Sequence, residues 1–254
     1  MPAVDRFNLG PDAWLLVMTG AGISAESGLA TFRAADGLWE GWPVEQVATP
    51  EGFRDDPALV WRFYSERREA AAAAEPNAAH SALAAVEREL GDRFLLVTQN
   101  VDGLHQRAGS KRVVELHGSL WLRRCSRCGR PDEPDRTWPV APPLPLCDQC
   151  VRSDGSTALL RPAIVWFGEQ LDPETQVAVH RYLRRARAAG GAITYLAVGT
   201  SGNVYPAAGY VLDAKTAGAD TWLANLEPAV NDRSFDHVVL GQATEVLPRL
   251  LRPA

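Results

Sequence analysis

Short apolar runs that each lead directly into a polar or glycine-bearing loop recur along this chain and constrain its fold more than any other feature. Three of them cover residues 14–18, 94–98 and 193–198. Continuous apolar runs of this length are typical of parallel strands that are buried on both faces. The loops after parallel strands meet at one edge of the sheet, where α/β folds bind their ligands. The pattern therefore predicts a parallel sheet with one site at its edge.

Further predicted strands alternate with predicted helices. We expect the remaining strands at 111–116, 163–167, 221–225 and 237–240. We expect helices at 57–74, 77–90, 173–189 and 206–217. Asn77 suits a helix N-cap and Gly91 suits a helix end. This alternation predicts an α/β fold with a doubly wound parallel sheet.

Composition excludes several classes of protein. The 254 residues suffice for one large domain with a small insert, and 46% of them are hydrophobic. A net charge of −5 argues against non-specific nucleic-acid binding. No apolar run approaches the roughly 18 residues of a membrane helix, and the N-terminus lacks a signal-peptide pattern. We therefore expect a cytoplasmic protein with no membrane or direct nucleic-acid partner.

All four cysteines lie in the segment 123–160, which is rich in proline and charge and interrupts the alternation of strands and helices. They form two Cys-x-x-Cys pairs, Cys125 with Cys128 and Cys147 with Cys150. This spacing predicts one tetrahedral zinc ion, and four thiolates leave no open position for catalysis. Two disulfides or a redox pair are the alternative, which a chain without a secretion signal disfavours.

Three polar loops after predicted strands suggest a dinucleotide site. The first spans 20–24, and the others are 199–201 and 225–227. Glycines let backbone N–H groups approach a pyrophosphate, and Glu227 could accept a hydrogen bond from a ribose hydroxyl. The glycine spacing departs from Gly-x-Gly-x-x-Gly, so a glycine turn without a ligand is the alternative for the first loop.

The segment 98–118 concentrates amide, carboxylate and imidazole groups directly after a predicted strand. Gln99, Asn100 and Asp102 follow that strand, and His117 ends the next. We interpret this segment as the catalytic centre. For His117 the alternative is a structural histidine at a strand end.

Together these motifs resemble the sirtuins, the NAD-dependent protein-lysine deacylases. The resemblance covers nearly the whole chain, with matching motifs at 20–24, 31–33, 99–102, 117–118, 165–169, 199–201 and 225–227 and at the four cysteines. It implies a Rossmann-like domain and a smaller zinc-binding domain within one catalytic unit over 1–254. In this division the insert 123–160 binds zinc, 31–75 contributes to the small domain and the acyl pocket, and the remainder binds NAD.

The resemblance also implies a role for each matching residue. His117 matches the general base, and Cys125, Cys128, Cys147 and Cys150 match the ligands of one structural zinc ion. The positions that match the NAD site are Gly20, Ala21, Gly22, Ile23, Ser24, Phe32, Arg33, Gln99, Asn100, Asp102, Gly199, Thr200, Ser201, Asn225, Leu226, Glu227 and Ala243. The positions that match the substrate peptide site are Val165, Trp166, Phe167, Gly202, Val204 and Tyr205.

In the implied reaction the acyl oxygen of the substrate attacks the anomeric carbon of the NAD ribose and nicotinamide leaves. His117 then accepts a proton from the ribose hydroxyls, and an imidazole suits this step because its reference pKa of about 6.5 is near working pH. The products are free lysine, nicotinamide and 2′-O-acyl-ADP-ribose. The implied partners are acyl-lysine proteins or peptides.

Tyr64 and Arg67 bear on the choice of acyl group. They are three residues apart in a predicted helix, so they share a face. No acidic residue stands three or four positions from Arg67, and a guanidinium beside a phenol suits a carboxylate. A solvated surface arginine is the alternative, and spacing alone does not separate Arg67 from Arg68.

The Tyr-x-x-Arg pair resembles that of the class III sirtuins, and Ala35 matches the small residue beside their acyl channel. This resemblance selects Tyr64 and Arg67 and implies a preference for succinyl and malonyl groups that does not exclude deacetylation. Mono-ADP-ribosyl transfer and a non-catalytic NAD-sensing module are the alternative functions. A monomer is expected.

Overall fold

A six-stranded sheet lies at the centre of the larger part of the computed structural model, which describes residues 9–31, 38–39, 41–128, 132–151 and 153–251. The strand order is β12-β11-β10-β1-β4-β5, and every neighbouring pair is parallel. The strands are β1 (Trp14–Thr19), β4 (Phe94–Thr98), β5 (Val113–Glu115), β10 (Ile193–Val198), β11 (Asp220–Asn225) and β12 (His237–Leu240). The predicted parallel sheet is confirmed.

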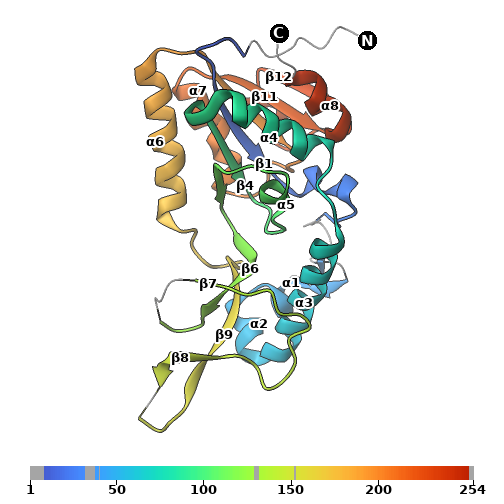
Figure 1. The fold of residues 1–254 in the computed structure, drawn as a ribbon, viewed down its shortest axis with the longest axis vertical. Coiled ribbons are helices and arrows are strands. Elements are labelled where there is room, and N and C mark those ends of the chain that lie inside the picture. Colours follow the sequence, from blue (N-terminus) through green and yellow to red (C-terminus); the bar gives the residue numbers. More distant parts are fainter. Residues whose placement is uncertain (1–8, 32–37, 40, 129–131, 152, 252–254) are drawn as a thin grey trace.

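Helices cover both faces of this sheet (Figure 1). Alternate residues of a strand point to opposite faces. Leu15 and Val17 of β1 belong to the core beneath α4 (Ala78–Leu90) and α8 (Ala243–Leu250). Leu16 and Met18 belong to the core beneath α6 (Pro173–Ala189) and α7 (Tyr210–Thr216). The sheet is therefore doubly wound, as predicted.

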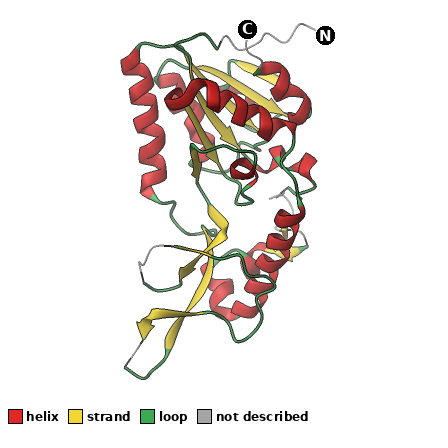
Figure 2. Ribbon diagram, in the orientation of Figure 1, coloured by secondary structure: helices red, strands yellow, loops and turns green. Residues whose placement is uncertain are grey.

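A second body of the molecule extends away from this sheet (Figure 2). It contains an antiparallel sheet in the order β7-β6-β9-β8, a two-stranded β2-β3 pair and three helices. Their bounds are β2 (Leu38–Trp39), β3 (Trp42–Pro43), α1 (Val44–Val47), α2 (Pro50–Asp55), α3 (Pro57–Ala73), β6 (Gly118–Cys125), β7 (Glu133–Pro134), β8 (Leu146–Val151) and β9 (Thr157–Ile164). We call this body, with its described residues in 38–74 and 118–169, the small lobe, and the rest the large lobe.

The expected strand at 163–167 is wrong as a member of the parallel sheet. Its first two residues end β9, which pairs antiparallel with β6 in the small lobe. Ile164 and Trp166 instead pack in a core with Phe53 and Phe63. The expected helix at 206–217 begins later, at Tyr210, after a short 3-10 turn at Ala207–Gly209. Helix α8 was not expected, and it carries Pro248 in its interior, a position where proline is normally disfavoured.

The two lobes meet at the loop that follows β4. Leu120 of β6 donates its backbone N–H to the carbonyl of Val101 at 2.9 Å. The indole N–H of Trp121 donates to the carbonyl of Asp102 at 2.8 Å. From α5 (Leu104–Arg107), Arg107 donates to the carbonyl of Ala71 near the end of α3 at 2.9 Å. Within the described part of the chain, no helix is both long and apolar enough to span a membrane.

Candidate active site

A cleft of about 1560 Å³ opens between the large and small lobes. The loops after β1, β4, β10 and β11 form one wall, and α3 and residues 164–169 of the small lobe form another. Ligand pockets typically measure about 300–1,000 Å³. The cleft therefore has room for a large ligand together with part of a second one.

The first and third loops of the large lobe are in direct backbone contact. Gly22 donates its N–H to the carbonyl of Gly199 at 2.9 Å. A Cβ added at Gly22 would lie 2.6 Å from the Cα of Gly199, and Gly199 itself has a φ of +61°. Only glycine satisfies both requirements, so these glycines bring two loops to one point at the sheet edge.

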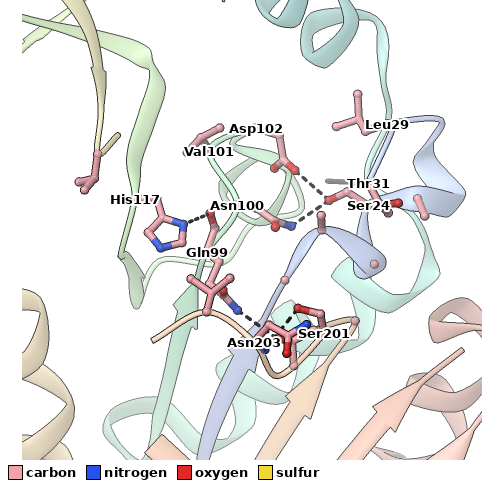
Figure 3. Close-up of a pocket in the computed structure, with 18 of the residues that line it drawn as sticks. Ser24, Leu29, Thr31, Gln99, Asn100, Val101, Asp102, His117, Ser201 and Asn203 are labelled. Carbon is pink, nitrogen blue, oxygen red and sulfur yellow. Dashed lines mark hydrogen bonds between the residues drawn. The ribbon is translucent and has the colours of Figure 1, made fainter. Parts of the chain in front are cut away.

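The first loop is also bonded to the loop after β4 by buried polar groups (Figure 3). The Ser24 hydroxyl donates to Asp102 Oδ2 at 2.8 Å, and Asn100 Nδ2 donates to Ser24 Oγ at 3.1 Å. Burial raises the pKa of Asp102, and a backbone N–H from Leu104 partly offsets this. This network fixes three polar side chains at the floor of the cleft.

His117 stands beside that network with its two ring nitrogens in different environments. Nδ1 lies 3.0 Å from the carbonyl oxygen of Gln99. A carbonyl only accepts, so Nδ1 carries the proton and Nε2 keeps its lone pair. Burial lowers the pKa of His117, although the Gln99 carbonyl opposes this shift. The neutral imidazole is therefore ready to accept a proton at Nε2.

Two more hydrogen bonds link the loops after β4, β10 and β11. Gln99 Nε2 donates to Thr200 Oγ1 at 3.3 Å, and Asn225 Nδ2 donates to the carbonyl of Thr200 at 3.0 Å. Leu226, Glu227 and Ala243 line the same side of the cleft. The polar loops predicted to form one site thus lie together.

The structure separates the two adjacent arginines of α3. Arg67 and Tyr64 both line the cleft, and both side chains are buried. The guanidinium carbon of Arg67 lies 3.9 Å from the ring centre of Phe63. Arg68 faces away and donates to Asp135 Oδ2 at 2.9 Å within the small lobe. Arg67 is therefore the arginine placed for a ligand in the cleft.

Residues 165–167 form the small-lobe rim of the cleft, and Val204 and Tyr205 lie on the large-lobe rim. Val165 donates its N–H to the carbonyl of His117 at 2.9 Å, which places this segment beside the histidine. Tyr205 is 75% exposed. The two rims leave an open entrance to the cleft.

Not every expected site residue reaches the cleft lining. The side chain of Ile23 is buried in the large-lobe core, and Gly202 packs against Asn231. Phe32, Arg33 and Ala35 lie outside the described residues.

Sequence reasoning also missed one wall of the cleft, which α6 supplies through Pro173, Gln176, Val177 and His180. The spacing of these positions follows the i, i+3, i+4, i+7 pattern of a single helix face, and that pattern was the available signal.

The four cysteines of the small lobe converge on one point. Their Sγ atoms all lie within 4.8 Å of one another. Cys125 and Cys150 are 3.6 Å apart, and Cys128 and Cys147 are 3.9 Å apart. A tetrahedron with Zn–S bonds of about 2.3 Å has edges of about 3.8 Å, whereas a disulfide needs about 2.05 Å. The donors fit one structural zinc ion and exclude two disulfides.

Comparison with known proteins identifies the family of this chain. The model of the Sir2 family matches residues 20–206. An NAD-dependent protein deacylase of Pasteurella multocida is 48% identical over 239 residues, which cover 93% of this chain and 96% of that protein. A protein with the same description from Escherichia coli K12 is 49% identical and covers 93% of this chain and 80% of that protein.

Several solved structures that are similar to this chain contain bound ligands. A Sir2 homologue in complex with NAD is 41% identical, with a TM-score of 0.81 over 94% of this chain and 88% of that one. A mutant Sir2 homologue bound to 2′-O-acetyl ADP ribose is 42% identical, with a TM-score of 0.81 over 94% and 90%. A Sir2 mutant with a p53 peptide and NAD is 31% identical, with a TM-score of 0.75 over 94% and 92%. This chain belongs to the Sir2 family.

Proposed function

We propose that this protein removes acyl groups from lysine side chains of proteins in an NAD-dependent reaction, and that it prefers succinyl and malonyl groups. The observation that carries the proposal is the content of a single cleft. It holds a histidine whose Nε2 can accept a proton, the polar loops of the large lobe, and the Tyr64–Arg67 pair. Family membership and relatives described as NAD-dependent protein deacylases support the activity.

The large-lobe loops fit NAD by their chemistry. Gly20, Ala21, Gly22 and Ser24, with Gly199 to Ser201, would face its phosphates, and Asn225 to Glu227 with Ala243 would face its adenosine end. Gln99, Asn100 and Asp102 would surround the nicotinamide ribose. Bound NAD supplies a glycosidic bond whose cleavage drives acyl transfer from lysine to ADP-ribose.

His117 would act as the general base. The Gln99 carbonyl holds the proton on Nδ1, so Nε2 is the atom that accepts a proton from a ribose hydroxyl. The lowered pKa keeps the ring neutral at physiological pH. A base in this state is available without prior deprotonation.

The substrate backbone would lie between residues 165–167 and 202–205. The N–H groups of Val165, Trp166 and Phe167 already donate to His117, Glu169 and Ala48. This segment would therefore hold a peptide through its carbonyl oxygens, with the peptide as donor, as in strand addition.

Tyr64 and Arg67 would bind the distal carboxylate of a succinyl or malonyl group. Arg67→Met should raise the KM for succinyl-lysine peptides far more than for acetyl-lysine peptides. Loss of a charge-assisted hydrogen bond costs roughly 1.5–3 kcal/mol, or about a tenfold to hundredfold effect. Steady-state kinetics with matched peptides measure it.

Arg62→Met is the control, because Arg62 is an exposed arginine of the same helix outside the cleft lining. It should leave the ratio of the two activities unchanged. Equal losses on both peptides in Arg67→Met would refute the carboxylate clamp.

A further inference from the structure

Trp166 joins the substrate-facing rim of the cleft to the acyl pocket. Its side chain is 3% exposed, and its indole Nε1 donates to the hydroxyl oxygen of Tyr64 at 2.9 Å. Its backbone follows Val165, which is bonded to His117. Trp166 therefore contacts Tyr64 directly, and its chain neighbour Val165 contacts the backbone of His117.

Three further contacts hold the Trp166 ring and backbone in place. The guanidinium carbon of Arg161 lies 3.9 Å from the ring centre, and the ring of Phe53 lies 5.4 Å away at 41°. Arg161 is itself paired with Glu169 at 2.7 Å. The other carboxylate oxygen of Glu169 accepts from the Trp166 backbone N–H at 2.9 Å. The indole N–H is thus a fixed donor.

A fixed indole donor determines how Tyr64 can act. An indole N–H only donates, so the Tyr64 oxygen must accept from Trp166 and direct its own proton elsewhere. Burial raises the pKa of Tyr64, so the phenol is neutral. A neutral phenol that donates suits a carboxylate, whereas a phenolate would repel one.

We propose that Trp166 is a positioning residue for acyl selectivity, whose indole N–H fixes the Tyr64 hydroxyl for donation to the distal carboxylate of the acyl group. The inference rests on the proposed preference for acidic acyl groups. It adds a determinant outside the Tyr64–Arg67 pair, from a segment 102 residues away in the chain.

The test replaces Trp166 by phenylalanine, which keeps an aromatic ring and removes the donor. The ratio of kcat/KM for succinyl-lysine to that for acetyl-lysine peptides should fall about three- to tenfold, mainly through KM for the succinyl peptide. Trp222→Phe is the matched control, because its indole donates to Asp220 outside the cleft lining. The control should leave the ratio at the wild-type value.

A double-mutant cycle with Tyr64→Phe separates positioning from packing. In the Tyr64→Phe background, Trp166→Phe should change the ratio no further, since the acceptor is already gone. A full additional loss in that background, or an equal loss on both peptides in the single variant, would overturn the proposal.

If Trp166→Phe fails to fold, Tyr64→Phe alone decides through the ¹H NMR shift of the Trp166 indole proton. That resonance should move upfield when its acceptor is removed, and an unchanged shift would overturn the proposal. Failure of the underlying function has a different signature, which is a wild-type enzyme without succinyl preference. The inference alone would fail if the wild type prefers succinyl and the ratio of the two activities changes in Arg67→Met but not in Trp166→Phe. The proposed function would then stand.

Discussion

At the scale of single residues, the backbone carbonyl of Gln99 sets the chemistry of His117. The carbonyl binds the Nδ1 proton and leaves Nε2 as the acceptor. His117→Ala should therefore lower turnover by at least the 10²–10⁴-fold typical of general bases, while NAD binding persists. Calorimetric titration with NAD and single-turnover deacylation measure the two quantities.

His237→Ala is the matched control, because His237 is an exposed histidine at the start of β12, with Nε2 2.9 Å from Asp220 Oδ1 of β11. It should retain wild-type turnover. Near-normal activity of His117→Ala would remove the histidine from the reaction.

Sequence reasoning at this scale works best where chemistry restricts spacing. Two Cys-x-x-Cys pairs have few uses, so their convergence on one point was predictable. The hydrogen bond between Trp166 and Tyr64 was not, because no local pattern links residues 102 positions apart. The separation of Arg67 from Arg68 also required the fold, since Asp135 selects Arg68 from a distant loop.

At the scale of elements, two buried histidines connect α4 and α5 to the start of the loop after β4. His80 and His105 have ring centres 4.8 Å apart. His105 Nε2 lies 2.9 Å from Thr19 Oγ1, and Thr19 donates to Thr98 at 2.8 Å. Thr98 in turn accepts from the backbone N–H of Asn100 at 3.0 Å. Both imidazoles are buried, so a positive charge on either ring is unfavourable.

Acid should weaken this pair. Burial lowers the pKa of His80 to about 4 and, together with the neighbouring His80, that of His105 to about 3. Unfolded histidine titrates near 6.5, so the unfolded state binds more protons between about pH 6.5 and 4, and stability falls as the pH drops through this window. Each histidine should lower the free energy of unfolding by about 2 kcal/mol between pH 7 and pH 5.

Urea unfolding at pH 7 and pH 5 measures this loss of stability. The loss should be smaller in His80→Asn than in the wild type. The exposed His180, paired with Asp213, provides the control substitution, His180→Asn. An identical loss in wild type and His80→Asn would contradict this assignment.

The central strands β1, β4 and β10 of the large sheet were predictable because each is a largely buried apolar run. The run at 163–167 has the same composition, yet its register partner is β6 and it serves the small-lobe core. An apolar run indicates burial and does not identify the core in which it is buried. The shift in the start of α7 has a similar basis, since helix propensity does not mark the 3-10 turn that precedes it.

At the scale of the whole molecule, β6 connects the four-cysteine zinc site to the loop after β4. Its last residue is Cys125, and Leu120 and Trp121 within it are bonded to Val101 and Asp102. We expect about one zinc ion per chain by metal analysis. Removal of the metal with a chelator should unfold the small lobe and abolish turnover, because structural zinc contributes folding free energy.

Circular dichroism and activity measured during chelation and zinc readdition test this expectation, and zinc should restore both signals. Full activity of a metal-free protein would contradict a structural role for the cluster.

The relation between the two lobes was the least predictable property of the chain. A cleft requires loops of the large lobe to face α3 and residues 164–169 of the small lobe. The hydrogen bonds that set this arrangement join segments that share no sequence pattern. One example is the pair that Arg107 donates to backbone carbonyls at the end of α3.

The most direct test of the account is nicotinamide release by the purified protein with NAD and matched peptides that carry succinyl-lysine or acetyl-lysine. Mass spectrometry follows the peptide in the same reaction. The account predicts NAD-dependent loss of both acyl groups, with a clear preference for succinyl-lysine. A preference for acetyl-lysine would contradict the carboxylate clamp, and no NAD-dependent loss of either group would contradict the deacylase function itself.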